Sequence, residues 1–241
     1  MIDNEYPSFT SDNVYFLGDT HTLAFTNILK KHNLKDFILI HVGDAGEGFR
    51  GNSYTDVYDL DSLNKYCRDN NGRIFIVRGN HSNPDFYTKD HWSTKCEFVK
   101  FVPDYTYFNI NGKVCLFVGG AVSIDRQDRI LDDDYWRGEE FHLLDTYKDL
   151  PPCDILITHT SPTSAFPIDG LSRISGWFKN DPTLREELIK ERANLQLLYE
   201  HVNCNKLYYG HFHHSASEYF NGCYHRCLNI DELVDATYEF R

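Results

Sequence analysis

Short apolar runs that stop abruptly at a polar corner recur along the chain and constrain its fold more than any other feature. They occupy residues 14–17, 37–42, 74–77, 114–118, 155–157 and 207–209. Runs of this length, rich in Val, Ile, Phe and Tyr, are typical of strands whose two faces are both buried. A glycine stands at most of the corners that follow, where it lets the backbone turn sharply into a loop. We therefore expect a set of buried strands, each ending in a sharp turn.

Helical patterns separate the early strand candidates. They cover residues 23–32 and 56–69, and a longer charged segment covers residues 182–201. The last one begins with Asp181 as a plausible cap and Pro182 in its first turn. An order of strand, helix and strand predicts parallel pairing with right-handed crossovers.

Other segments lack a helix between neighbours and are interpreted as hairpins. They are residues 96–102, 105–110, 218–229 and 236–240. Asn111-Gly112 is a typical hairpin turn between two such strands. These segments fit either a second sheet or antiparallel edges.

The chain has 241 residues, of which 41% are hydrophobic and 15% aromatic, so it can bury a large core. No linker, low-complexity tract or internal repeat divides it. We expect a single domain over residues 1–241.

Charge and cysteine content narrow the functional classes. The formal net charge of −12 repels nucleic acid and anionic membranes, so binding to duplex DNA is not expected. The first ten residues lack the basic start and apolar run of a secretory signal, and no stretch has the roughly 18 apolar residues of a membrane span. Seven cysteines without a CxxC pair suit a reducing compartment, so we expect a cytoplasmic protein.

Side chains that bind metal ions follow the strand candidates at the position where open α/β sheets carry their ligand sites. They are Asp19, His21, Asp44, Asn80, His81, His159, His211 and His213. Carboxylate, imidazole and carboxamide donors together suit Mn, Fe, Zn or Ni, and suit Mg or Ca poorly. The set exceeds what one ion needs, but two ions that share a bridging carboxylate would use it fully. Two such ions can activate a bridging hydroxide and hold the oxygens of a phosphoryl group.

Two other patterns are interpreted as packing rather than as sites. His41 lies inside a strand candidate, where a hydrogen-bonded core histidine is expected. Cys223, His225 and Cys227 alternate along another strand candidate, and no fourth metal ligand accompanies them. A single buried Asp or His at a strand end is also often only structural, so the metal prediction depends on the whole ordered set.

The order of the motifs resembles that of the calcineurin-like metallophosphoesterases. The motifs are Asp19-x-His21, Gly43-Asp44, Gly79-Asn80-His81, His159 and Gly210-His211-x-His213. The resemblance implies a four-layer α/β/β/α sandwich of two mixed sheets flanked by helices, with two divalent metal ions, manganese before the others. It implies that one ion is bound by Asp19, His21, Asp44 and His213, and the other by Asp44, Asn80, His159 and His211. Asp44 would bridge the ions, and His81 would be the general acid.

Arginines are candidates for holding the substrate phosphate. Arg50 and Arg126 are the first choices, with Arg78 and Arg129 as further ones. Arg50 is displaced from the position of the phosphate-gripping arginine in the protein-phosphatase branch of the family. Ser82 stands where many members have an acidic residue beside the catalytic histidine, which leaves open whether His81 has a carboxylate partner.

These features predict a hydrolase, acting as a phosphatase or phosphodiesterase on a small or peptide-borne phosphate ester. One alternative is a catalytically silent member that binds a protein partner, which missing ligands would favour. Another is a nuclease, which a basic groove would favour, but the sequence has no cluster of five or more Lys and Arg residues.

Overall fold

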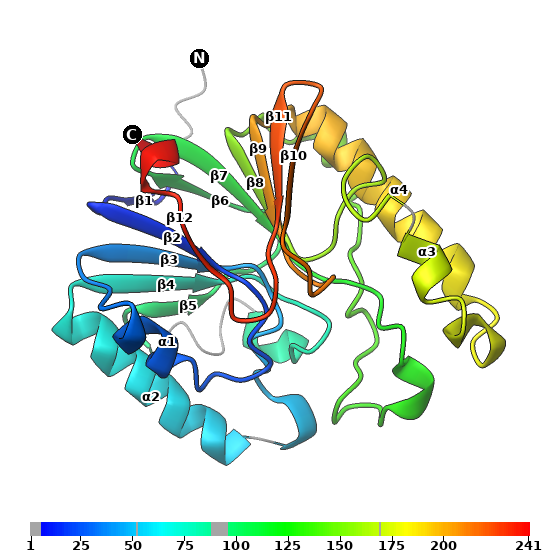
Figure 1. Ribbon diagram of the computed structural model, residues 1–241, viewed down its shortest axis with the longest axis horizontal. Coiled ribbons are helices and arrows are strands. Elements are labelled where there is room, and N and C mark those ends of the chain that lie inside the picture. Colours follow the sequence, from blue (N-terminus) through cyan, green and yellow to red (C-terminus); the bar gives the residue numbers. More distant parts are fainter. Residues whose placement is uncertain (1–5, 52, 88–95, 169) are drawn as a thin grey trace.

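Two sheets dominate the computed structural model, which describes residues 6–51, 53–87, 96–168 and 170–241 (Figure 1). Within this part of the chain, the larger sheet has the strand order β1 (Ser8–Phe9), β6 (Thr106–Ile110), β7 (Lys113–Val118), β8 (Ile155–Thr158), β9 (Lys206–Tyr209), β11 (Cys223–Cys227) and β10 (Ala216–Phe220). The smaller sheet has the order β12 (Leu233–Asp235), β2 (Asn13–Leu17), β3 (Phe37–His41), β4 (Gly72–Ile76) and β5 (Val99–Phe101).

Helices cover the outer face of each sheet, while the inner faces pack against each other (Figure 1). Helices α1 (Thr26–Lys31) and α2 (Ser53–Asp69) lie on the smaller sheet, and the long helix α4 (Leu184–Val202) lies on the larger one. A short helix, α3 (Gly170–Arg173), precedes α4. The expected α/β sandwich of two mixed sheets flanked by helices is confirmed.

The near-continuous apolar runs follow from burial of both faces of a strand. In β2, Phe16 belongs to the core between the sheets, whereas Leu17 packs under the helices. In β3, Ile40 likewise belongs to the core between the sheets, and Leu39 packs under the helices. Successive side chains of a strand point to opposite faces, so each face needs its own apolar set.

Parallel pairing runs through the centre of both sheets. Strand β3 pairs parallel with β2 and with β4, and strand β8 pairs parallel with β7 and with β9. Parallel strands end at the same edge of their sheet, so the loops after β2, β3, β4, β8 and β9 can contribute to one site.

The two hairpin predictions that contain an Asn-Gly turn are confirmed. Strands β6 and β7 pair antiparallel on either side of Asn111-Gly112, and β10 and β11 do so on either side of Asn221-Gly222. Strand β12 adds to the smaller sheet by pairing antiparallel with β2.

Two other hairpin predictions are wrong. Within residues 96–102, strand β5 pairs parallel with β4, which the long connection between them permits. Residues 236–240 contain the 3₁₀ helix η6 (Thr237–Phe240) rather than a strand. There Phe240 enters the core between the sheets, and the Thr237 hydroxyl accepts a hydrogen bond from the Val14 amide at 3.1 Å.

Helix α4 begins at Leu184, two residues later than predicted. The N-cap residue is Thr183 rather than the expected Asp181, but Asp181 Oδ1 still accepts a hydrogen bond from the Leu184 amide at 3.2 Å. No helix in the described part of the chain combines the length and the apolar character needed to cross a bilayer.

Candidate metal centre

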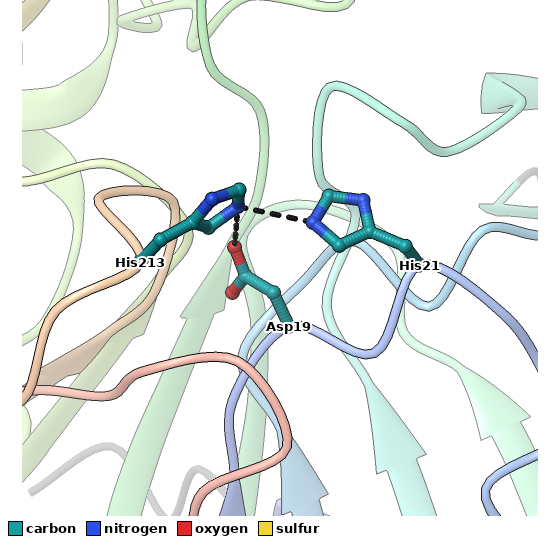
Figure 2. A group of neighbouring side chains, drawn as sticks. All are labelled: Asp19, His21 and His213. Carbon is teal, nitrogen blue, oxygen red and sulfur yellow. Dashed lines mark hydrogen bonds and ion pairs between the residues drawn. The ribbon is translucent and has the colours of Figure 1, made fainter.

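The loops after β2, β3, β4, β8 and β9 bring the predicted metal-binding side chains together at one end of the sandwich. A first cluster contains Asp19, His21 and His213 (Figure 2). The Nε2 atom of His213 lies 3.0 Å from Nε2 of His21 and 3.4 Å from Oδ2 of Asp19. These side chains come from segments that are 192 residues apart in the sequence.

A second cluster is built around the side-chain oxygen of Asn80. This Oδ1 atom lies 3.1 Å from Nε2 of His159 and 2.9 Å from Nδ1 of His211. The Asp44 carboxylate is close to both clusters. Its Oδ1 atom lies 3.2 Å from His159 Nε2, and it forms potential metal-binding groups with His21 and with Asp19.

The hydrogen bonds of the second cluster leave acceptor atoms facing one another. Nδ1 of His159 donates to the Val42 carbonyl at 2.9 Å, so Nε2 of the neutral ring carries a lone pair. The Asn80 amide nitrogen donates to Ser123 Oγ at 3.0 Å, which turns the Asn80 oxygen toward the imidazoles. Buried acceptors in such contact need a cation or extra protons between them.

The separations also suit metal ligands. Donor atoms about 2.1 Å from an ion and at right angles to each other lie about 3 Å apart. The contacts in both clusters, from 2.9 to 3.4 Å, fall in this range. Donor type and spacing therefore fit the divalent ions expected from the sequence.

Glycines in the motifs make room for ligands from other motifs. A Cβ atom on Gly79 would lie 2.0 Å from Oδ1 of Asp44, and one on Gly210 would lie 2.1 Å from Oδ1 of Asp19. Larger residues at either position would push a carboxylate out of the centre. The glycine corners thus allow the close approach of backbone and ligand.

Four of the candidate ligands have a backbone conformation that is uncommon for residues other than glycine. They are His21 (φ 53°), Asp44 (φ 55°), His211 (φ 69°) and His213 (φ 48°). Such conformations cost free energy and gather where surrounding structure holds side chains in a functional arrangement.

The charges at the centre depend on one another. Burial opposes ionisation of Asp44, but the imidazoles of His159 and His81 outweigh burial and hold the pKa of this carboxyl well below its usual range. Burial also opposes a charged His159, yet Asp44 raises the pKa of that imidazole to about 9. Burial, with His159 beside it, lowers the pKa of His211 well below its usual range. The pocket therefore stabilises the ionised form of Asp44 when a positive charge lies beside it.

His81 lies beside the clusters and has partners on both ring nitrogens. Nδ1 lies 2.8 Å from Oδ2 of Asp44, and Nε2 accepts a hydrogen bond from Arg129 at 2.6 Å. Its carboxylate partner is therefore Asp44. The Arg129 side chain is only 4% exposed and also pairs with Asp125 at 2.6 Å.

A cavity of ≈ 420 Å³ opens at the centre, and Arg129 lines it. Arg50 and Arg126, the first choices for holding phosphate, are not among its lining residues. Arg126 pairs with Asp181 at 2.6 Å and with Glu187, while Arg50 pairs with Asp134 at 3.1 Å. Arg78 is buried, and it pairs with Asp104 and bonds main-chain carbonyls.

Two residues near the centre were not predicted from the sequence. Ser123 binds the Asn80 amide, and its own backbone amide donates to Glu139 Oε1 at 3.1 Å. The only sequence signal for Ser123 is its place shortly after the Gly119-Gly120 corner of β7.

The packing interpretations agree with the structure. His41 is buried, and its Nε2 lies 3.0 Å from the Thr20 hydroxyl. Cys223, His225 and Cys227 are buried along β11, where His225 Nε2 contacts the Tyr199 hydroxyl at 2.9 Å.

Three comparisons relate the chain to known proteins. No curated protein matches its sequence. One solved structure has 14% identity and a TM-score of 0.53, with coverage of 95% of this chain and 96% of that chain. The TT1561 protein of Thermus thermophilus has 12% identity and a TM-score of 0.49, and the match covers 95% of this chain and 96% of that chain. Phosphopantetheinyl hydrolase (PptH) from Mycobacterium tuberculosis has 14% identity and a TM-score of 0.46, and the match covers 96% of this chain and 93% of that chain.

A family model described as calcineurin-like phosphoesterase matches residues 13–215, which includes every candidate ligand. This match spans most of the sequence, from β2 to the loop after β9. The chain therefore belongs to the calcineurin-like phosphoesterase family.

Proposed function

We propose that the protein is a phosphoesterase with a binuclear metal centre, which hydrolyses a phosphate monoester or diester of a small molecule or peptide. The observation that carries this proposal is the convergence of two clusters of metal-binding atoms with the Asp44 carboxylate between them. Family membership supports metal-dependent phosphoester chemistry in general.

The first ion would be held by the cluster of Asp19, His21 and His213, and the second by Asn80, His159 and His211. Asp44 would bridge them, since it contacts His159 and forms a potential metal-binding group with His21. Manganese is the first choice, because a mixed set of carboxylate, imidazole and amide donors suits it, while Fe, Zn or Ni fit the same set.

When bound, the two ions would supply activation of the attacking water and neutralisation of charge on the phosphoryl oxygens. The chain's own residues would do the rest. His81 would hold, on Nε2, the proton that the leaving oxygen needs as its bond to phosphorus breaks, with the leaving oxygen in the place that Arg129 takes in the free protein. Arg129, which lines the cavity and contacts His81, would add a fixed positive charge beside the phosphoryl group.

The strong net negative charge favours a small soluble ester over a long nucleic acid, because the protein repels polyanions at long range. The complete donor set also argues against the silent, protein-binding alternative. Neither Arg50 nor Arg126 lines the cavity, so Arg129 replaces them as the proposed phosphate contact.

The direct test is hydrolysis by metal-stripped protein resupplied with Mn²⁺. p-Nitrophenyl phosphate and bis(p-nitrophenyl) phosphate, assayed side by side, separate phosphatase from phosphodiesterase activity. The proposal expects turnover of at least one, abolished by a chelator. Turnover that survives complete removal of metal would contradict it.

The Asp44→Asn variant tests the bridge. It should lose bound metal and activity together, by more than the roughly 10- to 100-fold that loss of an outer partner of a metal site costs. Asp145→Asn is the matched control, since Asp145 is exposed and neither belongs to the candidate metal-binding groups nor lines the cavity. Full metal content and activity in Asp44→Asn would contradict the ligand assignment.

A further inference from the structure

The cavity at the metal centre is lined by apolar side chains as well as by the polar groups of the clusters. The apolar side chains form a wall that includes Ile124, Phe166, Leu171, Ile174, Trp177 and Leu188. The volume of ≈ 420 Å³ lies within the range of small-molecule sites, which are mostly apolar with a few polar groups at the reacting end.

Most of this apolar wall is separate from the core of the sandwich, and Phe166 is the wall residue that also packs against the core under α4. Leu188 belongs to a small cluster with Val122 and Leu184, and Ile174 and Trp177 are only partly buried against it. The wall therefore keeps apolar surface at the cavity instead of using it to join the sheets and helices. Apolar surface retained around a cavity is typical of a ligand site.

The part of the wall that contains Phe166 is held in place by Arg192 of α4. Its guanidinium group donates to the main-chain carbonyls of Ser161, Pro162, Ala165 and Pro167 at 2.7 to 3.2 Å. These bonds fix the segment after β8 against α4. This part of the wall is therefore formed before a ligand arrives, which lowers the entropic cost of binding.

The same bonds determine what the wall can recognise. Arg192 is a charged side chain of the lining, and four of its five N–H groups already donate to main-chain carbonyls. Other lining side chains, such as Leu171 and Ile174, offer no hydrogen-bonding groups. A sugar or a nucleobase buried here would leave polar groups without partners, which costs free energy.

We infer that the cavity binds the organic group of the phosphate ester, and that this group is apolar, an aryl ring or an alkyl chain of about six carbons. This inference rests on the proposed function, because the phosphoryl group must lie at the metal centre for its organic group to reach Ile174 and Trp177. It assigns a substrate class that the metal centre alone does not specify.

The experiment compares methyl, butyl and hexyl phosphate, measured by release of inorganic phosphate, with the matching alkyl methyl diesters, measured by release of the alcohol. For whichever ester type is hydrolysed, kcat/KM should rise about fourfold for each methylene that becomes buried. Glycerol 3-phosphate, whose carbon chain carries hydroxyls, should gain nothing over methyl phosphate. Equal kcat/KM along the alkyl series would overturn the inference while leaving the proposed function intact.

A binding measurement separates the two proposals. Calorimetry with the Mn²⁺-loaded protein compares methylphosphonate with hexylphosphonate, neither of which can be hydrolysed. Tighter binding of hexylphosphonate, with no turnover of any ester, would retain the apolar site and reject the proposed function. Equal binding of both would overturn the apolar site whatever the turnover.

Variants of Ile174 test whether the preference for longer alkyl esters depends on the apolar wall. Ile174→Asn should lower the ratio of hexyl to methyl kcat/KM by at least about fourfold, and Ile174→Ala should lower it in the same direction if the asparagine variant does not fold. The matched control is Ile189→Asn, because Ile189 of α4 is 44% exposed and does not line the cavity. An unchanged ratio in a folded Ile174 variant would contradict the assignment.

Discussion

At the scale of single residues, the metal centre depends on the direction in which one amide group points. Asn80 offers its oxygen to His159 and His211 because its nitrogen is bound by Ser123. Partners of this kind orient ligands, and their loss typically costs about 10- to 100-fold in metal affinity or activity. We therefore propose a positioning role for Ser123.

Ser123→Ala should weaken binding of one Mn²⁺ ion by about 10- to 100-fold, since the Asn80 amide is then free to rotate. Equilibrium dialysis at limiting Mn²⁺ measures this directly. The control is Ser62→Ala, because the Ser62 hydroxyl donates only to the Tyr58 carbonyl on the exposed side of α2. Equal affinity for both ions in Ser123→Ala and wild type would count against the positioning role.

His81→Ala should keep both ions but lower the rate by about 10²-fold or more, because a general acid is lost. The loss should be larger for an alkyl ester than for a p-nitrophenyl ester, since the alkoxide needs protonation more. Steady-state kinetics on methyl and p-nitrophenyl esters, with His142→Ala as an exposed control, test this. A loss independent of the leaving group would indicate another role for His81.

That the candidate ligands lie together could be predicted from the sequence, because each follows a strand at a fixed place in the chain. The arginine contacts could not. Arg126 and Arg129 both follow the same glycine corner, but Arg126 meets Asp181 and Glu187, which lie 55 and 61 residues away. Such pairing depends on tertiary packing, and it leaves Arg129 as the residue that reaches His81.

At the scale of elements, the central strands were predictable because burial of both faces produces continuous apolar runs. The edges were less predictable. Strand β5 has three residues and lies far from β4 in the sequence, so no local pattern indicates its parallel pairing. The apolar wall around Ile174 and Trp177 was not predicted either, since its residues gain a common role only by packing on α4.

Helix α4 carries a buried carboxyl that links stability to pH. Glu191 Oε1 accepts a hydrogen bond from the Phe141 amide at 3.0 Å, and burial raises the pKa of Glu191 from 4.5 to about 8. Between these values the folded chain holds a proton that the unfolded chain has lost. The contribution of Glu191 to the free energy of unfolding is therefore fully favourable below pH 4.5 and decreases as pH rises toward 8.

The Glu191→Gln variant has no carboxyl group to titrate at this position. The difference between its Tm and the wild-type Tm should therefore increase in favour of the variant as pH rises from about 5 to about 8. Thermal unfolding across this range, with Glu186→Gln of the exposed face of α4 as control, measures the difference. Parallel Tm curves for wild type and Glu191→Gln would mean that Glu191 does not titrate in this range in the folded protein.

At the scale of the whole molecule, one core between the sheets joins the two halves of the chain. Phe16 of the smaller sheet stacks on Tyr208 of the larger one with ring centroids 3.7 Å apart. The metal centre also takes side chains from both halves, as His159 and Asp44 do. The prediction of a single domain follows from this shared core and centre.

A single domain should unfold in one cooperative transition. Far-UV and near-UV circular dichroism, recorded on the metal-stripped protein during urea unfolding, should give coincident curves. Two separated transitions would contradict the single-domain prediction. The proposed centre exists only in the folded state, so Mn²⁺ should raise the midpoint in proportion to the logarithm of its concentration.

Two ions that Asp44 joins in one centre would be magnetically coupled. Electron paramagnetic resonance of metal-stripped protein titrated with Mn²⁺, with bound metal counted by dialysis, tests this arrangement. Two ions per chain and the spectrum of a coupled pair, lost in Asp44→Asn, are the predicted result. A single ion per chain, or two ions with the spectrum of isolated Mn²⁺, would contradict it.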